Sequence, residues 1–162
     1  MLQTKQVKND DVPYELIYLA DEDDDQIKKY IDSSTFLATI DDEKIIGIIG
    51  MNEINEKSTE IVCVAVDEDY QNKKIGTNLI EKAISVSKEK NYKEIIIKTG
   101  NCGIGQLYLY QRCGFRFDSV NKNYMIENYK NPIYENDIQC IDQIILKYRI
   151  YSEKELDRKS VV

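Results

Sequence analysis

Histidine and tryptophan are both missing from this chain of 162 residues. Without histidine, the Ser-His and Cys-His arrangements of nucleophilic catalysis are excluded, and the usual ligand sets of zinc are unavailable. Proton transfer must then rely on carboxylates, tyrosine, lysine, cysteine or water. The four cysteines form no Cys-x-x-Cys pair, so we expect no metal site and four reduced thiols.

Long apolar runs are also missing. The run Ile45–Ile49 has the length of a strand, far below the ~20 residues that a membrane span needs. The first ten residues are polar and carry no signal-peptide stretch. The net charge of −7 argues against nonspecific nucleic-acid binding. These features predict a cytoplasmic protein that needs neither a membrane nor a nucleic acid as partner.

No repeat, low-complexity stretch or Pro/Gly-rich linker divides the chain, which predicts a single domain over 1–150 and a charged tail over 151–162. The acidic run Asp21–Asp25 is interpreted as a solvated surface without function. Helices are expected from a cap at Asp11 with Pro13 in the first turn, and over 26–31, 74–90, 104–112 and 124–129. Strands are expected over 2–8, 35–40, 44–51, 59–66, 93–98, 115–120 and 138–148. This order predicts an α/β fold, a mixed sheet with helices on both faces.

The segment Gln71–Thr77 joins a β-branched strand directly to the long helix. Such a tight connection leaves backbone N–H groups unpaired at the helix start, where the helix dipole also favours an anion. Lys73 and Lys74 add positive charge, and Gly76 has no Cβ to keep a ligand away from the backbone. No Gly-Lys-Ser/Thr follows, which argues against a nucleotide triphosphatase. On these residues alone, ordinary surface chemistry remains the alternative.

The same segment resembles the acyl-CoA motif of the GNAT family of N-acetyltransferases, Gln/Arg-x-x-Gly-x-Gly/Ala, and it follows a Val-Ala-Val strand at the family's spacing. Membership would imply a mostly antiparallel central sheet and acetyl-CoA as co-substrate. One position departs from the motif, because Lys74 replaces its first glycine and would either crowd the pyrophosphate or pair with it. The resemblance implies these cofactor-binding residues: Val64, Ala65, Val66, Gln71, Asn72, Lys73, Lys74, Ile75, Gly76 and Thr77.

A second stretch, Leu107–Phe115, resembles the family's Leu-Tyr-x-x-x-Gly-Phe signature. By position, Tyr110 is then the tyrosine that reprotonates the departing CoA thiolate. A phenol titrates near ~10 and a thiol near ~8.5, so a phenol close to the sulfur can share its proton. The family often has an asparagine at the start of this helix, and the resemblance makes Asn101 a candidate for it and for cofactor binding, although Asn101 lies two residues further from Gly114 than usual. The alternative for Tyr110 is simple packing on the sheet.

A base is also needed, because amines arrive protonated, with a pKa near ~10.4 for a lysine type. Glu60 precedes Gln71 by the offset of the general base in the family's histone-acetylating branch. Alternation along a strand is expected to put Glu60 on the face of Val64 and Val66. Ordered water is the other acceptor that we consider.

The resemblance implies direct transfer from acetyl-CoA to a small-molecule or peptide amine, and it leaves a homodimer open. Acidic and aromatic residues favour a cationic acceptor. Two other functions remain open, a non-catalytic acyl-CoA-binding or sensing module and a protein-interaction domain without a small ligand. The residues expected around the acceptor are Tyr14, Tyr18, Tyr30, Tyr124, Glu127, Tyr129 and Glu135.

Overall fold

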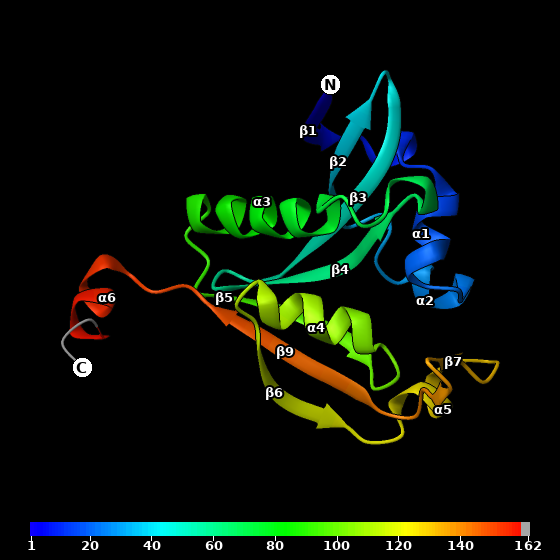
Figure 1. Cartoon of the computed structure of the whole chain (residues 1–162). Helices are drawn as coiled ribbons and strands as arrows, with labels where there is room; N and C mark the ends of the chain where they lie inside the picture. Colours follow the sequence, from blue (N-terminus) through cyan, green and yellow to red (C-terminus); the bar gives the residue numbers. More distant parts are fainter. Residues whose placement is uncertain (160–162) are drawn as a thin grey trace.

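The computed structural model describes residues 1–159, which are built around a seven-stranded sheet of order β1-β2-β3-β4-β5-β9-β6 (Figure 1). Neighbouring strands are antiparallel except β4 and β5, which run parallel. This arrangement confirms the expected mixed, mostly antiparallel sheet. The strands of the sheet are β1 Leu2–Val7, β2 Thr35–Asp41, β3 Lys44–Asn55, β4 Ser58–Val66, β5 Glu94–Gly100, β6 Arg116–Asn121 and β9 Gln143–Arg149.

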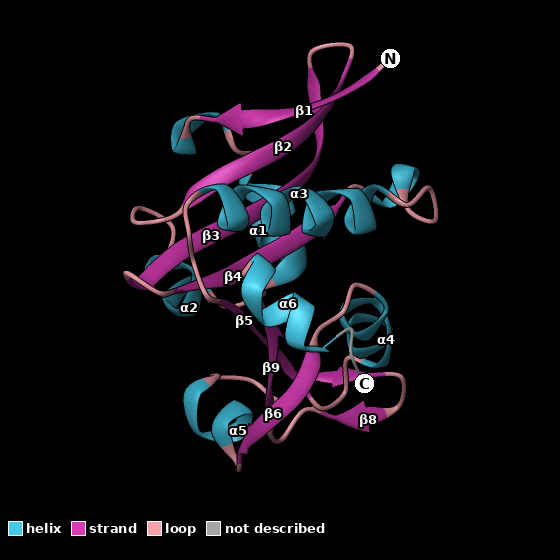
Figure 2. Cartoon of the chain, turned by 90° about the vertical axis from the view of Figure 1, so that its left-hand side faces the viewer, coloured by secondary structure: helices cyan, strands magenta, loops and turns pink. Residues whose placement is uncertain are grey.

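Helices cover both faces of the sheet (Figures 1 and 2). On one face, α3 and α4 enclose a core that contains Leu79, Ile95 and Phe115. On the other face, α1 and α2 enclose a second core that contains Ile17 and Phe36. The helices are α1 Tyr14–Ala20, α2 Asp24–Lys28, α3 Ile75–Glu89, α4 Ile104–Arg112, α5 Tyr124–Asn128 and α6 Glu153–Lys159, with 3₁₀ turns η1 Asn9–Asp11 and η2 Glu68–Tyr70. No helix within residues 1–159 is long and apolar enough to cross a membrane.

Local sequence pattern explains the long crossover helix α3. Its apolar residues recur every three or four positions and therefore form one stripe. The sequence predicts this stripe, and in the structure it is buried against β2, β3 and β4. A parallel strand pair needs such a crossover, and α3 joins β4 to β5. The buried residues of α3 are Ile75, Leu79, Ile80, Ala83, Ile84 and Ser87.

The expected closing strand over 138–148 is wrong as a single strand. Ile138–Gln139 forms β8, which pairs with β7 (Tyr134–Glu135) in a separate two-stranded sheet. The chain then leaves the sheet over residues 140–142, and β9 begins at Gln143. Side-chain bonds and a disulfide to the segment before α4 hold this break, and neither shows in a local hydropathy pattern.

The helix starts also differ from expectation. Asp11 lies in η1, and Pro13 occupies the position before α1. The second helix begins earlier than expected because Asp23 caps it, its side chain accepting from the N–H groups of Asp25 at 2.9 Å and Gln26 at 3.3 Å. Of the predicted tail, α6 is helical, and residues 160–162 lie outside the described part of the chain.

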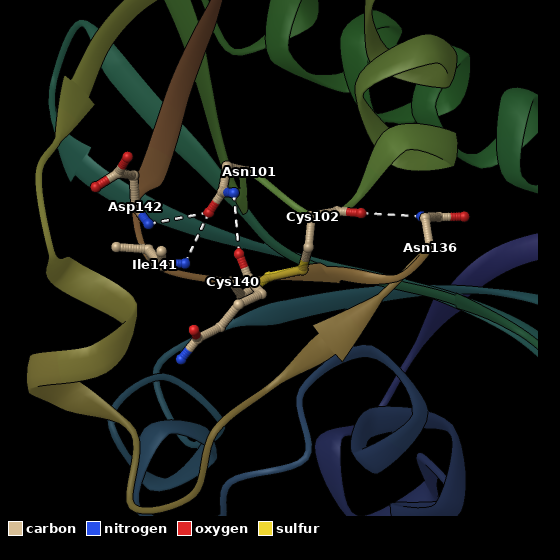
Figure 3. The surroundings of a disulfide bond; sticks show 7 residues. Asn101, Cys102, Asn136, Cys140, Ile141 and Asp142 are labelled. Atoms are coloured by element: carbon tan, nitrogen blue, oxygen red, sulfur yellow. Dashed lines mark hydrogen bonds between the residues drawn. A yellow bond between two sulfur atoms is a disulfide. The ribbon is translucent and has the colours of Figure 1, made fainter.

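Cys102 and Cys140 form a disulfide between the segment before α4 and the end of β8 (Figure 3). The expectation of four reduced thiols is therefore wrong for this pair, while Cys63 and Cys113 are free. The two bridged residues are 38 positions apart in sequence, so their proximity depends on the tertiary fold alone.

Candidate active site

The candidate site lies where strands β4 and β5 diverge. Their parallel pairing ends at Ile61 and Ile97. Beyond this point β4 follows β3 to Val66, and β5 follows β9 to Gly100. The edge of β4 over Val62–Val66 thus has no partner strand on its β5 side among the described residues. A cavity of about 390 Å³ opens in this gap.

Residues from both faces of the sheet line the cavity. Strand β4 contributes the predicted Val64, Ala65 and Val66, and the loop before α3 contributes Gln71. The other predicted residues of this loop, from Asn72 to Thr77, are not among the residues that line the cavity. Tyr110 enters from α4 on the α3 side of the sheet. The opposite wall comes from the loop between α1 and α2 and from the chain after α5. The cavity therefore connects the two sides of the sheet.

A β-bulge in β4 changes which of its residues share a face. The register with β3 shifts between Gly50 and Met51, which leaves Val62 as the extra residue. Ile61, before the bulge, packs in the core under α3 and α4. Val64, after the bulge, packs against the same core. An odd-numbered and an even-numbered residue therefore face the same way, so the simple alternation is broken.

Glu60 consequently lies on the face opposite to Val64 and Val66. The expectation that the three share a face is wrong, because it assumed an unbroken strand. The Oε1 atom of Glu60 lies 3.5 Å from Nζ of Lys98, and Lys98 lines the cavity. Glu60 thus contacts a residue of the cavity wall, Lys98, through an ion pair. Its role as the base stays a prediction.

The start of α3 presents the unpaired N–H groups that an anion site needs. The first bond along the helix runs from the N–H of Asn78 to the carbonyl oxygen of Lys74, at 3.0 Å. The N–H groups of residues 75–77 therefore have no partner within the helix. Lys74 precedes the helix, and its side chain makes no capping bond to these groups. They remain available to a phosphate, as does the positive end of a 15-residue helix.

The loop before α3 owes its shape to two left-handed residues. Asn72 and Lys74 both have φ of 63°, a conformation that favours glycine. This explains why the family motif has glycine where this chain has Lys74. The Lys74 side chain is exposed, so it does not fill the cavity. Gln71 ties the loop to the strand end, its Nε2 donating to the carbonyl oxygen of Val66 at 3.1 Å.

Tyr110 is the buried phenol of the cavity, with 7% of its surface exposed. Its ring packs at a tilt against Phe115, with centroids 6.4 Å apart. Burial raises the pKa of Tyr110 well above its usual value, and the neighbouring Cys63 and Glu135 raise it further. The phenol therefore keeps its proton near neutral pH and can donate it to a developing anion. Tyr110 and Gln71, the first residue of the predicted loop before α3, thus line one cavity.

The sequence analysis missed Asp21, at the end of α1, because it lies in an acidic run that looked like a solvated surface. Its carboxylate is partly buried in the cavity wall, and the phenol of Tyr129 donates to Oδ1 at 3.1 Å. Burial raises the pKa of Asp21 to about 6, although the hydrogen bonds from Tyr129 and from the backbone of Asp23 lower it. Asp21 is the C-cap of α1, and only the folded structure shows that it faces inward.

Of the seven residues expected around the acceptor, two line the cavity and five do not. Tyr129 and Glu135 line the cavity. Tyr14 and Tyr18 instead lie exposed on the outer side of α1, with their rings stacked at 6.3 Å. The hydroxyl of Tyr30 is buried without a hydrogen-bond partner among the described residues. The other two expected residues, Tyr124 and Glu127, belong to α5.

Asn101 has a structural position in this fold (Figure 3). Its Oδ1 accepts from the N–H groups of Ile141 at 2.8 Å and Asp142 at 3.0 Å, and its Nδ2 donates to the carbonyl oxygen of Gln139 at 3.1 Å. These bonds engage both ends of the amide and fix the chain between β8 and β9. The side chain of Asn101 thus serves the backbone in this structure, and its part in the cofactor site stays a prediction. Among residues 1–159, no group of three or more acidic or cysteine side chains is placed to hold a metal ion.

Comparisons with known proteins agree with this geometry. A model of the acetyltransferase (GNAT) family matches residues 4–115. An uncharacterized N-acetyltransferase of Bacillus subtilis, YvbK, is 34% identical over 138 residues, which are 85% of this chain and 88% of that protein.

Two solved structures are similar along nearly the whole chain. One is a GNAT family acetyltransferase from Elizabethkingia anophelis with acetyl-CoA bound, at a TM-score of 0.88 and 37% identity, covering 92% of this chain and 98% of that one. The other is a Bacillus subtilis acetyltransferase in complex with CoA, at a TM-score of 0.86 and 31% identity, covering 93% and 100%. The diverging strands, the loop before α3 and Tyr110 all lie within the matched residues. The chain therefore belongs to the GNAT family of acetyltransferases.

Proposed function

We propose that this acetyltransferase moves the acetyl group of acetyl-CoA directly to a primary amine of a small molecule or peptide. Acetyl-CoA is the co-substrate, since similar GNAT structures contain acetyl-CoA or CoA. The observation that carries the proposal is the cavity between β4 and β5, which Gln71 and Tyr110 both line. The cytoplasm as location and a homodimer as assembly stay predictions from the sequence.

The chemistry follows from the groups around the cavity. The free N–H groups at the start of α3 suit the pyrophosphate, and the unpaired edge of β4 over Val62–Val66 suits the pantetheine arm and the thioester oxygen. The neutral amine nitrogen attacks the thioester carbon, so that a C–N bond forms and the C–S bond breaks. The amine's proton passes to Glu60 or to water. Tyr110 gives its proton to the departing thiolate.

Thermal unfolding with and without acetyl-CoA tests the first half of this proposal. At ~100 times the dissociation constant, the ligand should stabilise the fold by about 2.7 kcal/mol, which is an easily measured rise in Tm. Absence of a rise would mean that the exposed Lys74 nevertheless keeps the pyrophosphate out, and an interaction domain would then be the better interpretation.

Release of CoA thiol during incubation with a panel of amines tests the second half. Amine-dependent release would support the transferase. Binding of acetyl-CoA without release by any amine would favour the acyl-CoA-binding or sensing module instead.

A further inference from the structure

The wall of the cavity opposite Tyr110 carries a carboxylate that no ion pair neutralises. Asp21 lines this wall with its carboxylate partly buried, and it makes no ion pair with any described residue. The charge of Lys29 lowers the pKa of Asp21, but less than burial raises it. Asp21 also sits at the end of α1, where the last helix carbonyls point, and their partial negative charge disfavours a second anion. An ionised carboxylate in this position gains from a cation that arrives with the ligand.

The neighbouring phenols support the same conclusion. Tyr129 already donates to one oxygen of Asp21, at 3.1 Å. The hydroxyl of Tyr30 is buried with no hydrogen-bond partner among the described residues, and it lies near enough to Asp21 and Tyr129 for their charges to influence its pKa. Carboxylate and phenol groups together suit an ammonium ion, which offers several N–H donors and binds to aromatic faces.

The charges of the whole cavity restrict the kind of acceptor. Its acidic lining residues are Asp21, Glu22 and Glu135. Its one lysine among the described residues, Lys98, already pairs with Glu60 at 3.5 Å. An acceptor with a carboxylate of its own would therefore meet three like charges and no unpaired cation. An acceptor with two positive charges would complement the cavity.

We propose that the acceptor is a small diamine or polyamine, whose distal ammonium group is bound by Asp21 and Tyr129 while its other amine faces Tyr110. The two ends suit one extended ligand, because Tyr110 enters from α4 on one face of the sheet and Asp21 from α1 on the other. This proposal rests on the proposed transferase activity and adds the substrate class to it.

The wall does not depend on Asp21 for its shape, which makes the proposal testable. Nε2 of Gln26 donates to the carbonyl oxygen of Asn128 at 2.9 Å, and Asp25 pairs with Lys130 at 2.7 Å. Both contacts join the same two segments that Asp21 and Tyr129 join. The substitution Asp21→Asn keeps the size of the side chain and an oxygen that can accept from Tyr129, but removes the charge.

The test compares the thiol-release kinetics of matched amines. The probes are α,ω-diamines of three to six carbons, the monoamines of the same length, and free lysine, which differs from 1,5-diaminopentane only by its carboxylate. For the wild type we expect kcat/KM for the preferred diamine to exceed that for its monoamine by about 30-fold or more, because a buried charge pair commonly contributes this much. Free lysine should react far more slowly than 1,5-diaminopentane.

Asp21→Asn should remove this preference by raising KM for the diamine about 30-fold, with little change in kcat and little effect on the monoamine. Asp25→Asn is the matched control, since it cuts a contact between the same segments outside the cavity, and it should leave the preference intact. Equal use of diamines and monoamines by the wild type would overturn the substrate class alone. An equal loss of activity with both amines in Asp21→Asn would show that the residue is merely structural. If none of the amines caused thiol release, the transferase activity itself would be overturned.

Discussion

The disulfide between Cys102 and Cys140 should contribute a large share of the stability of this fold. It closes a loop of 38 positions, for which the chain-entropy relation gives about 4 kcal/mol. For a chain of this size that corresponds to about 8–16 °C in Tm. The bonds of Asn101 to Gln139, Ile141 and Asp142 hold the same segment without the bridge, so the reduced protein should still fold.

Urea unfolding, monitored by circular dichroism, measures this contribution. The samples compared are oxidised protein, protein in excess dithiol, and the variant in which both cysteines are replaced by serine. Oxidised protein should unfold at the highest urea concentration, and the other two samples should agree with each other. Cys113→Ser is the control, because this free thiol lies at the end of α4 and takes no part in the bridge. Equal midpoints for oxidised and reduced protein, or four titratable thiols in unreduced denatured protein, would refute the reasoning.

Three further substitutions test single groups of the site. Asp21→Asn should raise stability at pH 7.5 by about 1–2 kcal/mol after allowance for partial exposure, because ionising a carboxyl whose pKa is raised to about 6 costs free energy in the folded state only. This gain should shrink as the pH falls from 6 toward 4, because Asp21 becomes neutral in the wild type over that range. A gain that does not change with pH in thermal unfolding would contradict this reasoning. Tyr129, Asp23 and Lys29 are the other groups near Asp21 whose protonation state must be considered. Lys74→Gly should stabilise the fold by about 0.5–1 kcal/mol, because glycine adopts the left-handed φ of 63° without strain. Lys73→Gly is the control: the φ of Lys73 is negative, so this substitution should destabilise the fold in the same urea assay. Tyr110→Phe should lower kcat for acetyl transfer by about 100-fold or more and leave the acetyl-CoA-induced rise in Tm intact, whereas unchanged kcat would exclude Tyr110 as the acid.

The parts of the fold that were predictable from the sequence depend on local pattern. The helix over 104–112 has the same bounds in the structure, because its ends coincide with Gly103 and Gly114. The stripe of α3 follows the period of a helix, and the loop before it resembles a family motif at every position but Lys74. These signals are contained in a few neighbouring residues, which is why they could be read without the tertiary structure.

Three of the missed features depend on residues that are distant in sequence. The bulge at Val62 is defined by its partner strand, since only the pairing of β4 with β3 reveals the extra residue. The break between β8 and β9 depends on Asn101, about 40 residues away. The disulfide is of the same kind, because four scattered cysteines do not indicate which of them meet.

Asp21 shows why an acidic run was a poor guide to function. Five consecutive acidic residues share one composition, but they have different environments in the structure. Asp23 caps α2, Asp25 pairs with Lys130 at the surface, and Asp21 alone of these three lines the cavity. Burying its charge beside the end of a helix opposes folding, and Asn in its place would avoid that cost. The cationic acceptor proposed above would offset, in the complex, the stability that the free protein loses at this carboxylate.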